Sequence, residues 1–161
     1  MMLLAEAVKE LRPDCKFIIK ENELIWLDDA SLKPSEAEIK DKINELQLKK
    51  AKEDKINELQ NAFTAEIEDL LSPLYHEMIS WYIQVDEARK IKNNKAVPTP
   101  FIDNLIKARD LGETREEFAD LVINNYNYYV ETYSKKLGKY QKLVKLVEKA
   151  NTLTDIDKIL W

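Results

Sequence analysis

Few residues of this sequence have the types and spacing that catalysis or metal binding requires. His76 is the one histidine and Cys15 the one cysteine, and they lie far apart in the chain. A zinc site would have to bring both together with carboxylates from elsewhere. The serines that could pair with the histidine are Ser72, Ser80 and Ser134, and no nucleophile motif surrounds them. We therefore predict no metal site and no catalytic pair.

Carboxylates are abundant, but they do not form a catalytic pattern. Charged residues make up 34% of the chain, so we interpret the acidic clusters as solvated helix faces: Glu66, Glu68, Asp69, Glu116, Glu117 and Asp120. With two glycines in 161 residues, neither GxGxxG nor GxxxxGK[ST] can be written. The sequence thus predicts a protein that is not an enzyme and has no cofactor. A helical enzyme that uses His76 or these carboxylates stays open as a third alternative.

Charge and hydropathy exclude two further classes of partner. The formal net charge is −5, which does not suit binding to a phosphate backbone. The longest uncharged run has ten residues, 121–130, too few to cross a bilayer. The first eleven residues carry charges where a signal peptide would be apolar. We therefore expect no nucleic-acid or membrane partner and a cytoplasmic place of synthesis, which leaves protein binding as the function to test.

The N-terminal segment, residues 1–33, predicts a small αββ cap. Apolar residues at helical spacing up to Leu11 indicate a short helix that Pro13 ends. Two strand-like runs follow, 16–20 and 23–27, separated by the pair Glu21-Asn22, which favours a tight hairpin. A lone hairpin is marginally stable, so the helix must cover one of its faces. Trp26 is then either part of this small core or a contact for a partner.

Residues 34–72 predict a long charged helix, which we call the rod. Ser35 with Glu38 forms a capping box at its start, and apolar residues then recur in steps of three and four. Ile39, Ile43 and Leu46 make a short stripe that needs some partner, because such a stripe left in water stabilises nothing. We list these three residues as candidate partner-binding positions.

A duplication divides the rod. The heptapeptide Asp-Lys-Ile-Asn-Glu-Leu-Gln occurs at 41–47 and again at 54–60. A shift of 13 residues turns one copy by about 220° from the other on a helix. Two interpretations stay open: a local duplication in an exposed helix, or a phase break between two coiled-coil segments that would form a dimer or trimer.

Residues 73–161 predict an antiparallel helical bundle. Ser72 and Pro73 can start the first helix, which runs to about Lys92, and a loop follows over 93–100. The next helix is expected over 101–110 with Gly112 as its left-handed C-cap. The capping box Thr114–Glu117 starts the last long helix, and Thr152 with Asp155 starts a short closing one. The bundle would pack around Trp81 and a tyrosine stripe, at Tyr126, Tyr129, Tyr133 and Tyr140.

Two positions of the last long helix are further candidates for partner binding. Tyr128 departs from the tyrosine stripe by about 100°, so it is either an exposed aromatic contact or a residue packed on Phe101 or Leu105. Gly138 lies opposite the stripe in mid-helix, where glycine costs up to about 1 kcal/mol against alanine. We interpret it as a site of close backbone approach, with an incidental glycine as the alternative.

The order of these pieces resembles small accessory proteins of the tail modules of bacteriophages and prophages. In that family a cap ending in a W-L-D strand leads into the pattern P-T/S-x-x-E-I and then into a coiled-coil-like helix. Here the strand corresponds to Leu24-Ile25-Trp26-Leu27-Asp28-Asp29. The pattern corresponds to Leu32-Lys33-Pro34-Ser35-Glu36-Ala37-Glu38-Ile39, and the helix that follows ends in Glu45-Leu46-Gln47. The second half resembles C-terminal domains of such tail-associated proteins at Trp81, Gln84, Glu87-Ala88-Arg89, Pro98-Thr99-Pro100-Phe101, Ala108-Arg109-Asp110-Leu111-Gly112, Gly138, Gln141, Ala150-Asn151-Thr152 and Trp161. The long duplicated rod departs from the family's pattern.

The resemblance implies a non-enzymatic protein that binds a tail-fibre or other tail protein, as an assembly chaperone or a structural adaptor. It would act in the host cytoplasm, with or without later incorporation into the virion tail. The cap would bind one partner and the bundle a second, and the rod would set the distance. The alternative is a small phage-encoded inhibitor that binds a host protein.

Overall fold

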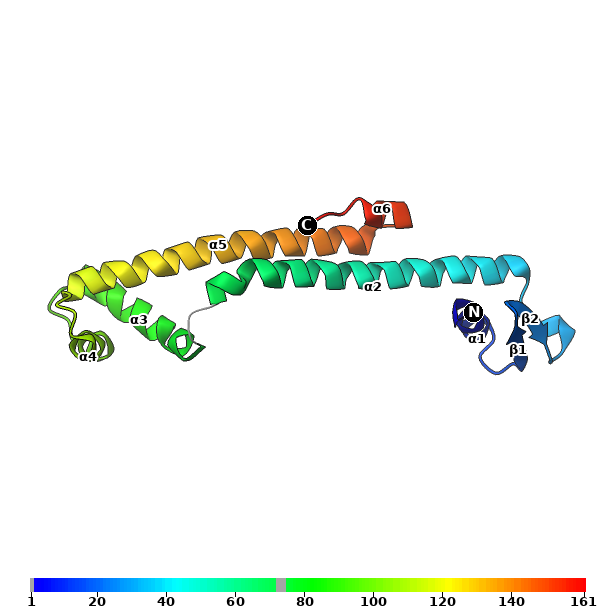
Figure 1. Ribbon diagram of the computed structural model, residues 1–161, viewed down its shortest axis with the longest axis horizontal. Coiled ribbons are helices and arrows are strands. Elements are labelled where there is room, and N and C mark those ends of the chain that lie inside the picture. Colours follow the sequence, from blue (N-terminus) through cyan, green and yellow to red (C-terminus); the bar gives the residue numbers. More distant parts are fainter. Residues whose placement is uncertain (1, 72–74) are drawn as a thin grey trace. The chain divides into compact units, whose positions relative to one another are not determined.

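The structure, a computed structural model, describes residues 2–71 and 75–161 and is mainly helical, as predicted (Figure 1). Ser72 and Pro73, the predicted start of the second long helix, lie outside the described residues, as does the side chain of His76. The elements in chain order are α1 (Met2–Leu11), β1 (Phe17–Lys20), β2 (Glu23–Trp26), the 3-10 helix η1 (Ala30–Leu32), α2 (Glu36–Leu71), α3 (Tyr75–Asn93), α4 (Pro100–Arg109), α5 (Arg115–Lys149) and α6 (Leu153–Asp157).

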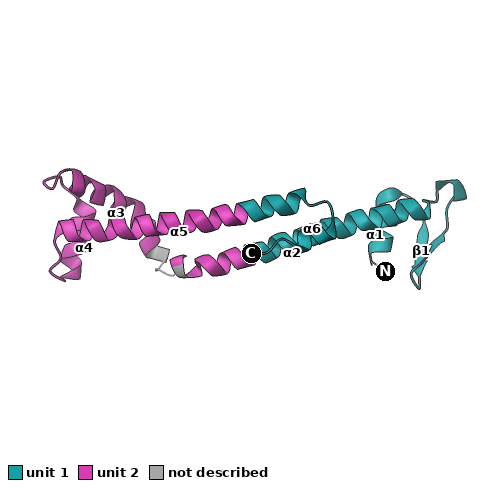
Figure 2. Ribbon diagram, turned by 90° about the horizontal axis from the view of Figure 1, so that it is seen from above, with its two compact units in different colours: residues 1–60, 142–161 teal, residues 61–141 magenta. Residues whose placement is uncertain are grey.

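The chain forms two compact units, coloured separately in Figure 2. Unit 1 holds residues 1–60 and 142–161, and unit 2 holds residues 61–141. Both long helices therefore contribute to both units, so this division differs from the predicted segments 1–33, 34–72 and 73–161. The helix α2 is continuous through 47–55, the stretch where the sequence left a break open.

Capping boxes are present at the starts of α2, α5 and α6, the first two as predicted. Oε2 of Glu38 accepts the backbone N–H of Ser35 at 2.7 Å, and the Ser35 hydroxyl accepts the N–H of Glu38 at 3.2 Å. Thr114 with Glu117 repeats this exchange at the start of α5, and Thr152 with Asp155 repeats it at α6. Each exchange satisfies backbone donors that a helix start leaves free, which explains why the helices begin at these residues.

In unit 1 the strands form the expected antiparallel hairpin, with Phe17 opposite Trp26 and Ile18 opposite Ile25. Its turn residues Glu21 and Asn22 both have positive φ, 51° and 68°, as a type I′ turn requires. One face of the hairpin is partly covered, and Trp26 on it stacks on Phe17 with ring centroids 6.5 Å apart. The other face leaves Ile18 and Ile25 exposed.

The two copies of the heptapeptide have the same pattern of burial. Leu46 is 6% exposed and its counterpart Leu59 is fully buried. Lys42 and its counterpart Lys55 each form an ion pair with the glutamate three residues on. Because the copies are turned by about 220°, these two buried leucines lie on nearly opposite sides of one helix.

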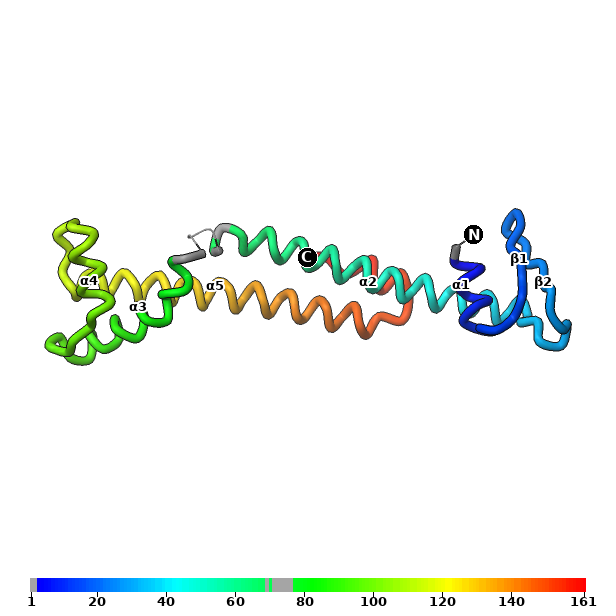
Figure 3. The backbone as a smooth tube through the Cα atoms, turned by 90° about the horizontal axis from the view of Figure 1, so that it is seen from below, coloured from blue at the N-terminus to red at the C-terminus, as the bar shows by residue number. Residues whose placement is uncertain are grey.

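A different part of unit 1 covers each side of α2. In Figure 1, α1 lies on one side of α2, and the end of α5 with α6 lies on the other. The view in Figure 3 agrees, because there α1 is superimposed on the first turns of α2. Contacts on the first side include an ion pair of 3.4 Å from Lys42 to Glu10 of α1. On the second side, Lys52 Nζ donates to the backbone oxygen of Glu148 at 2.9 Å.

In unit 2 the helices α3, α4 and the first half of α5 share a small core, whose buried members are Ala88, Ile91, Ile102, Phe118 and Ala119. The helix α4 ends one residue earlier than predicted. Asp110 is its left-handed cap, with φ 51°, and its N–H donates to the Ile106 carbonyl at 3.1 Å. Gly112 is also left-handed, with φ 72°, two residues beyond that cap. An aspartate tolerates this conformation well enough to take the place expected of glycine.

Candidate functional site

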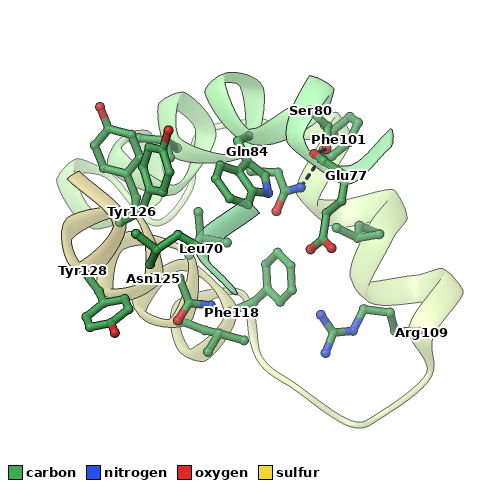
Figure 4. A pocket seen from close by; sticks show the side chains of 16 residues that line it. Leu70, Glu77, Ser80, Gln84, Phe101, Arg109, Phe118, Asn125, Tyr126 and Tyr128 are labelled. Carbon is green, nitrogen blue, oxygen red and sulfur yellow. Dashed lines mark hydrogen bonds between the residues drawn. The ribbon is translucent and has the colours of Figure 1, made fainter. Parts of the chain in front are cut away.

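An aromatic groove in unit 2 is the best-formed concave site of the described residues. Its volume is about 630 Å³, and it lies among the end of α2, α3, α4 and α5 (Figure 4). Ligand sites in proteins are commonly about 300–1,000 Å³ and mainly apolar, with a few polar groups. The lining residues that carry the argument below are Glu77, Trp81, Gln84, Arg109, Phe118 and Tyr128.

Aromatic contacts build the groove wall on the α5 side. The ring of Trp81 from α3 meets Tyr129 of α5 edge-on, with centroids 5.3 Å apart, and Tyr129 stacks on Tyr133 at 5.4 Å. Beyond the groove, Phe63 of α2 continues the series by stacking on Tyr140 at 5.2 Å. Burial raises the pKa of Tyr129 above its ordinary value of 10.0. The predicted packing of Trp81 against the tyrosine stripe is thus present, with Phe63 as an additional partner from α2.

A carboxylate of α3 fixes the start of α4. Glu87 is only 7% exposed, and its two oxygens accept the N–H groups of Phe101 at 3.2 Å and Ile102 at 2.8 Å. Thr99, the residue just before α4, makes no cap hydrogen bond of its own. A negative charge at a helix N-terminus is also favoured by the helix dipole. Glu87 therefore positions α4, and with it the α4 residues that line the groove.

Arg115 at the start of α5 holds the loop before α4. Its guanidinium donates to the backbone oxygens of Lys95 at 2.8 Å and Val97 at 2.6 Å, and to the Thr99 hydroxyl. Its Nε lies 2.8 Å from a carboxylate oxygen of Asp103. The planar donor fork of arginine suits such convergent acceptors. The loop and the first turn of α4 are therefore tied to α5.

Polar groups enter the groove at two places. Deep in it, Gln84 is 8% exposed and its Nε2 donates to the Ser80 hydroxyl at 2.8 Å. Figure 4 shows the side chains of Glu77 from α3 and Arg109 from α4 on the same side of the groove. Arg109 lies over the Phe118 ring, 5.0 Å from its centroid, and donates to Glu113 at 3.1 Å. The site thus combines aromatic walls, an internal amide and one charge of each sign.

Of the residues predicted to bind partners, Tyr128 alone lines this groove. Its side chain is 66% exposed, which agrees with an accessible aromatic contact. Trp26 lies in unit 1, where its ring stacks on Phe17 and its Nε1 donates to the Asp29 carbonyl at 2.9 Å. Apart from the adjoining residues and backbone of its own helix, no described atom lies within 4 Å of a Cβ built on Gly138, so none of the other described residues approaches the glycine closely.

The predicted binding stripe of the rod is covered by the chain itself. Ile39 is 9% exposed, Leu46 is 6% exposed, and Ile43 is partly buried. These side chains therefore have little apolar surface left for another protein. Self-association through this stripe stays a prediction, which a solution mass by light scattering would test.

The groove itself was not predicted from the sequence, although α3 contains a signal for it. Gln84 and Glu87 lie three residues apart on the face that also carries Trp81, Ala88 and Ile91. Polar residues on an apolar helix face are buried only with partners or beside a cavity. Glu87 has its partners in α4, and Gln84 borders the groove.

The described residues, 2–71 and 75–161, contain no group of three or more histidine, cysteine or acidic side chains placed to hold a metal ion. None of their helices is both long and apolar enough to span a bilayer.

No family model, no curated protein and no solved structure matches this sequence significantly.

Proposed function

We propose that this chain is a non-enzymatic binding protein of a bacteriophage or prophage tail module, and that the aromatic groove of unit 2 holds a segment of a tail-fibre or other tail protein. The groove is the observation that supports binding. Its walls expose aromatic surface, and aromatic residues dominate the energetics of protein interfaces. The class of partner comes from the sequence resemblance alone.

The groove suits a short segment better than a broad flat surface. A volume of about 630 Å³ accommodates a few side chains, as in complexes where a helix or extended peptide inserts its anchor residues. Such a protein would serve as an assembly chaperone that shields apolar residues of an unfinished fibre, or as an adaptor that stays with the fibre. Either role would begin in the host cytoplasm.

The test is binding to the tail-fibre protein of the same phage, measured by calorimetry with purified proteins. Tyr128→Ala and Leu121→Ala change exposed residues that line the groove. We expect each to weaken binding about tenfold or more, as truncation of an interface anchor does.

The chain offers matched controls on the outer face of α3. Tyr82 and Ile79 are 73% and 56% exposed and do not line the groove. Tyr82→Ala and Ile79→Ala should leave the affinity within about twofold, as neutral surface positions do. Equal losses from both pairs of variants would rule out the groove as the binding site. If the protein bound none of the tail proteins tested but bound a host enzyme, that result would favour the inhibitor function.

A further inference from the structure

The carboxamide of Gln84 is a mostly buried polar group of the groove whose hydrogen-bonding capacity is only half used. Its nitrogen has a partner in Ser80, whose hydroxyl in turn donates to the Glu77 carbonyl at 2.8 Å. Its oxygen accepts no hydrogen bond from the residues that the structure describes. Figure 4 shows this oxygen turned toward the space between the lining side chains. The side chain as a whole is 8% exposed, and the oxygen is at the surface of the groove, where solvent reaches it.

An acceptor that faces an aromatic groove selects for a donor once a ligand displaces the water around it. Leaving such an oxygen unpaired when a ligand displaces water costs binding free energy, and a ligand donor recovers that cost. The surrounding walls, Trp81, Phe118 and Tyr129, favour a flat apolar group. The occupant should therefore carry an aromatic ring with an N–H or O–H at its edge.

The lining also bears on the choice between an aromatic donor and a cation. Aromatic walls attract ammonium groups. Arg109, however, already lies over the Phe118 ring, so that ring is occupied by a guanidinium of the chain itself. Glu77 lies on the same side of the groove as Arg109, so the two opposite charges give a cation no clear advantage over a neutral indole. Indole is also a donor without acceptor atoms, so it suits a site whose free polar atom is an acceptor.

We propose that the groove recognises a tryptophan side chain of the partner protein, with its indole N–H donating to Oε1 of Gln84. This inference rests on the proposed function and names the anchor residue of the same site. Gln84 is then the specificity-determining residue, and the aromatic walls supply the remaining affinity.

The test uses two probes of nearly the same shape, indole and benzothiophene, which has sulfur in place of the N–H. Titrations of the full chain are followed by the ¹⁵N NMR signals of the Gln84 carboxamide and the Trp81 indole. Benzothiophene is the more hydrophobic probe, so burial alone would favour it. We expect indole to bind about tenfold more tightly, the factor that one hydrogen bond supplies when its acceptor would otherwise be covered without a partner.

Two variants separate the hydrogen bond from shape. Gln84→Met keeps the size and removes the acceptor, so the preference for indole should disappear. Gln84→Glu keeps acceptor oxygens, so the preference should survive, and it also serves if the methionine variant does not fold. Unchanged preference in a folded Gln84→Met variant, or equal binding of both probes to the unaltered protein, would overturn the inference.

Failure of this inference can be told apart from failure of the proposed function. If both probes shift the groove signals equally, the groove is still a binding site and only the choice of tryptophan is wrong. If tetramethylammonium binds more tightly than indole, the occupant is a cation. If no probe binds, the tryptophan assignment fails, and the calorimetric comparison of Tyr128→Ala with Tyr82→Ala decides on the groove.

Discussion

Leu46 and Leu59 hold the same place in two copies of one heptapeptide, and both are buried although they lie on nearly opposite sides of α2. The copies are 13 residues apart, which turns them by about 220°. Each copy also repeats the lysine–glutamate ion pair, Lys42 with Glu45 and Lys55 with Glu58. A single sequence motif thus supplies a buried leucine to each of two nearly opposite sides of one helix.

The first prediction concerns these two leucines. We expect Leu46→Ala and Leu59→Ala each to lower the free energy of unfolding by about 2–5 kcal/mol, because each removes a buried side chain. Urea denaturation measures this. Asn44→Ala and Asn57→Ala change exposed residues of the same two copies and should not destabilise the protein, because alanine is the better helix former. A neutral result for either leucine would mean that its side of α2 is not packed in solution.

The second prediction concerns the cap of α4. Glu87→Ala leaves the N–H groups of Phe101 and Ile102 without their acceptor, and we expect a loss of about 1–3 kcal/mol. The neighbouring Asp86→Ala is the control, since that carboxylate forms an exposed ion pair with Lys90 worth about 0.5 kcal/mol or less. Chemical denaturation of both variants compares them. Equal effects would argue against the buried cap.

The third prediction concerns the hairpin turn. Asn22 has φ 68°, a conformation that glycine adopts at lower cost, so Asn22→Gly should stabilise the protein by about 0.5 kcal/mol. The same replacement at Asn44, inside α2, should destabilise it by a few tenths of a kcal/mol. Thermal unfolding of the two variants is the measurement. Destabilisation by both would show that the turn is not of the I′ type.

The fourth prediction concerns pH. Hydrogen bonds from Ser35 hold the pKa of Glu38 below its ordinary value of 4.5, and hydrogen bonds from Thr114 do the same for Glu117. Because the pKa is lower in the folded state, this stabilisation is complete above about pH 4.5 and is lost as the pH falls toward the folded pKa.

Thermal unfolding from pH 7 to pH 3 tests the fourth prediction. The unfolding temperature of Glu38→Gln should lie below that of the unaltered protein at pH 7, and the gap should close below about pH 4.5. Asn44→Ala is the control. It changes no titratable group, so the difference between its unfolding temperature and that of the unaltered protein should not vary with pH over this range. A gap of constant size would show that the capping carboxylate does not act through its charge.

The sequence predicted the local elements better than the contacts between them. The capping boxes and the hairpin turn depend on residues within a few positions of one another, so their patterns are readable in the chain. The apolar stripe of α5 predicted which side is buried, but not that Phe63 of α2 packs against Tyr133 and Tyr140. A stripe defines a face, and many helices could cover it.

The candidate site was harder to predict for the same reason. Tyr128 was identified because it departs from the stripe of its own helix, and it does line the groove. The role of Gln84 depends on where α4 and α5 lie beside it, which no local pattern contains. Ile39 and Leu46 are buried within the single chain, and this burial likewise depends on elements far away in sequence.

The cap of α4 by Glu87 also bears on the order in which the chain folds. A ten-residue helix is too short to persist alone in water, and here the acceptor for its first N–H groups lies in another helix, 14 and 15 residues upstream. We therefore expect α4 to form only as it docks on α3. Until then the groove lacks the wall that α4 provides, so the proposed binding site would be completed in the same step that caps α4.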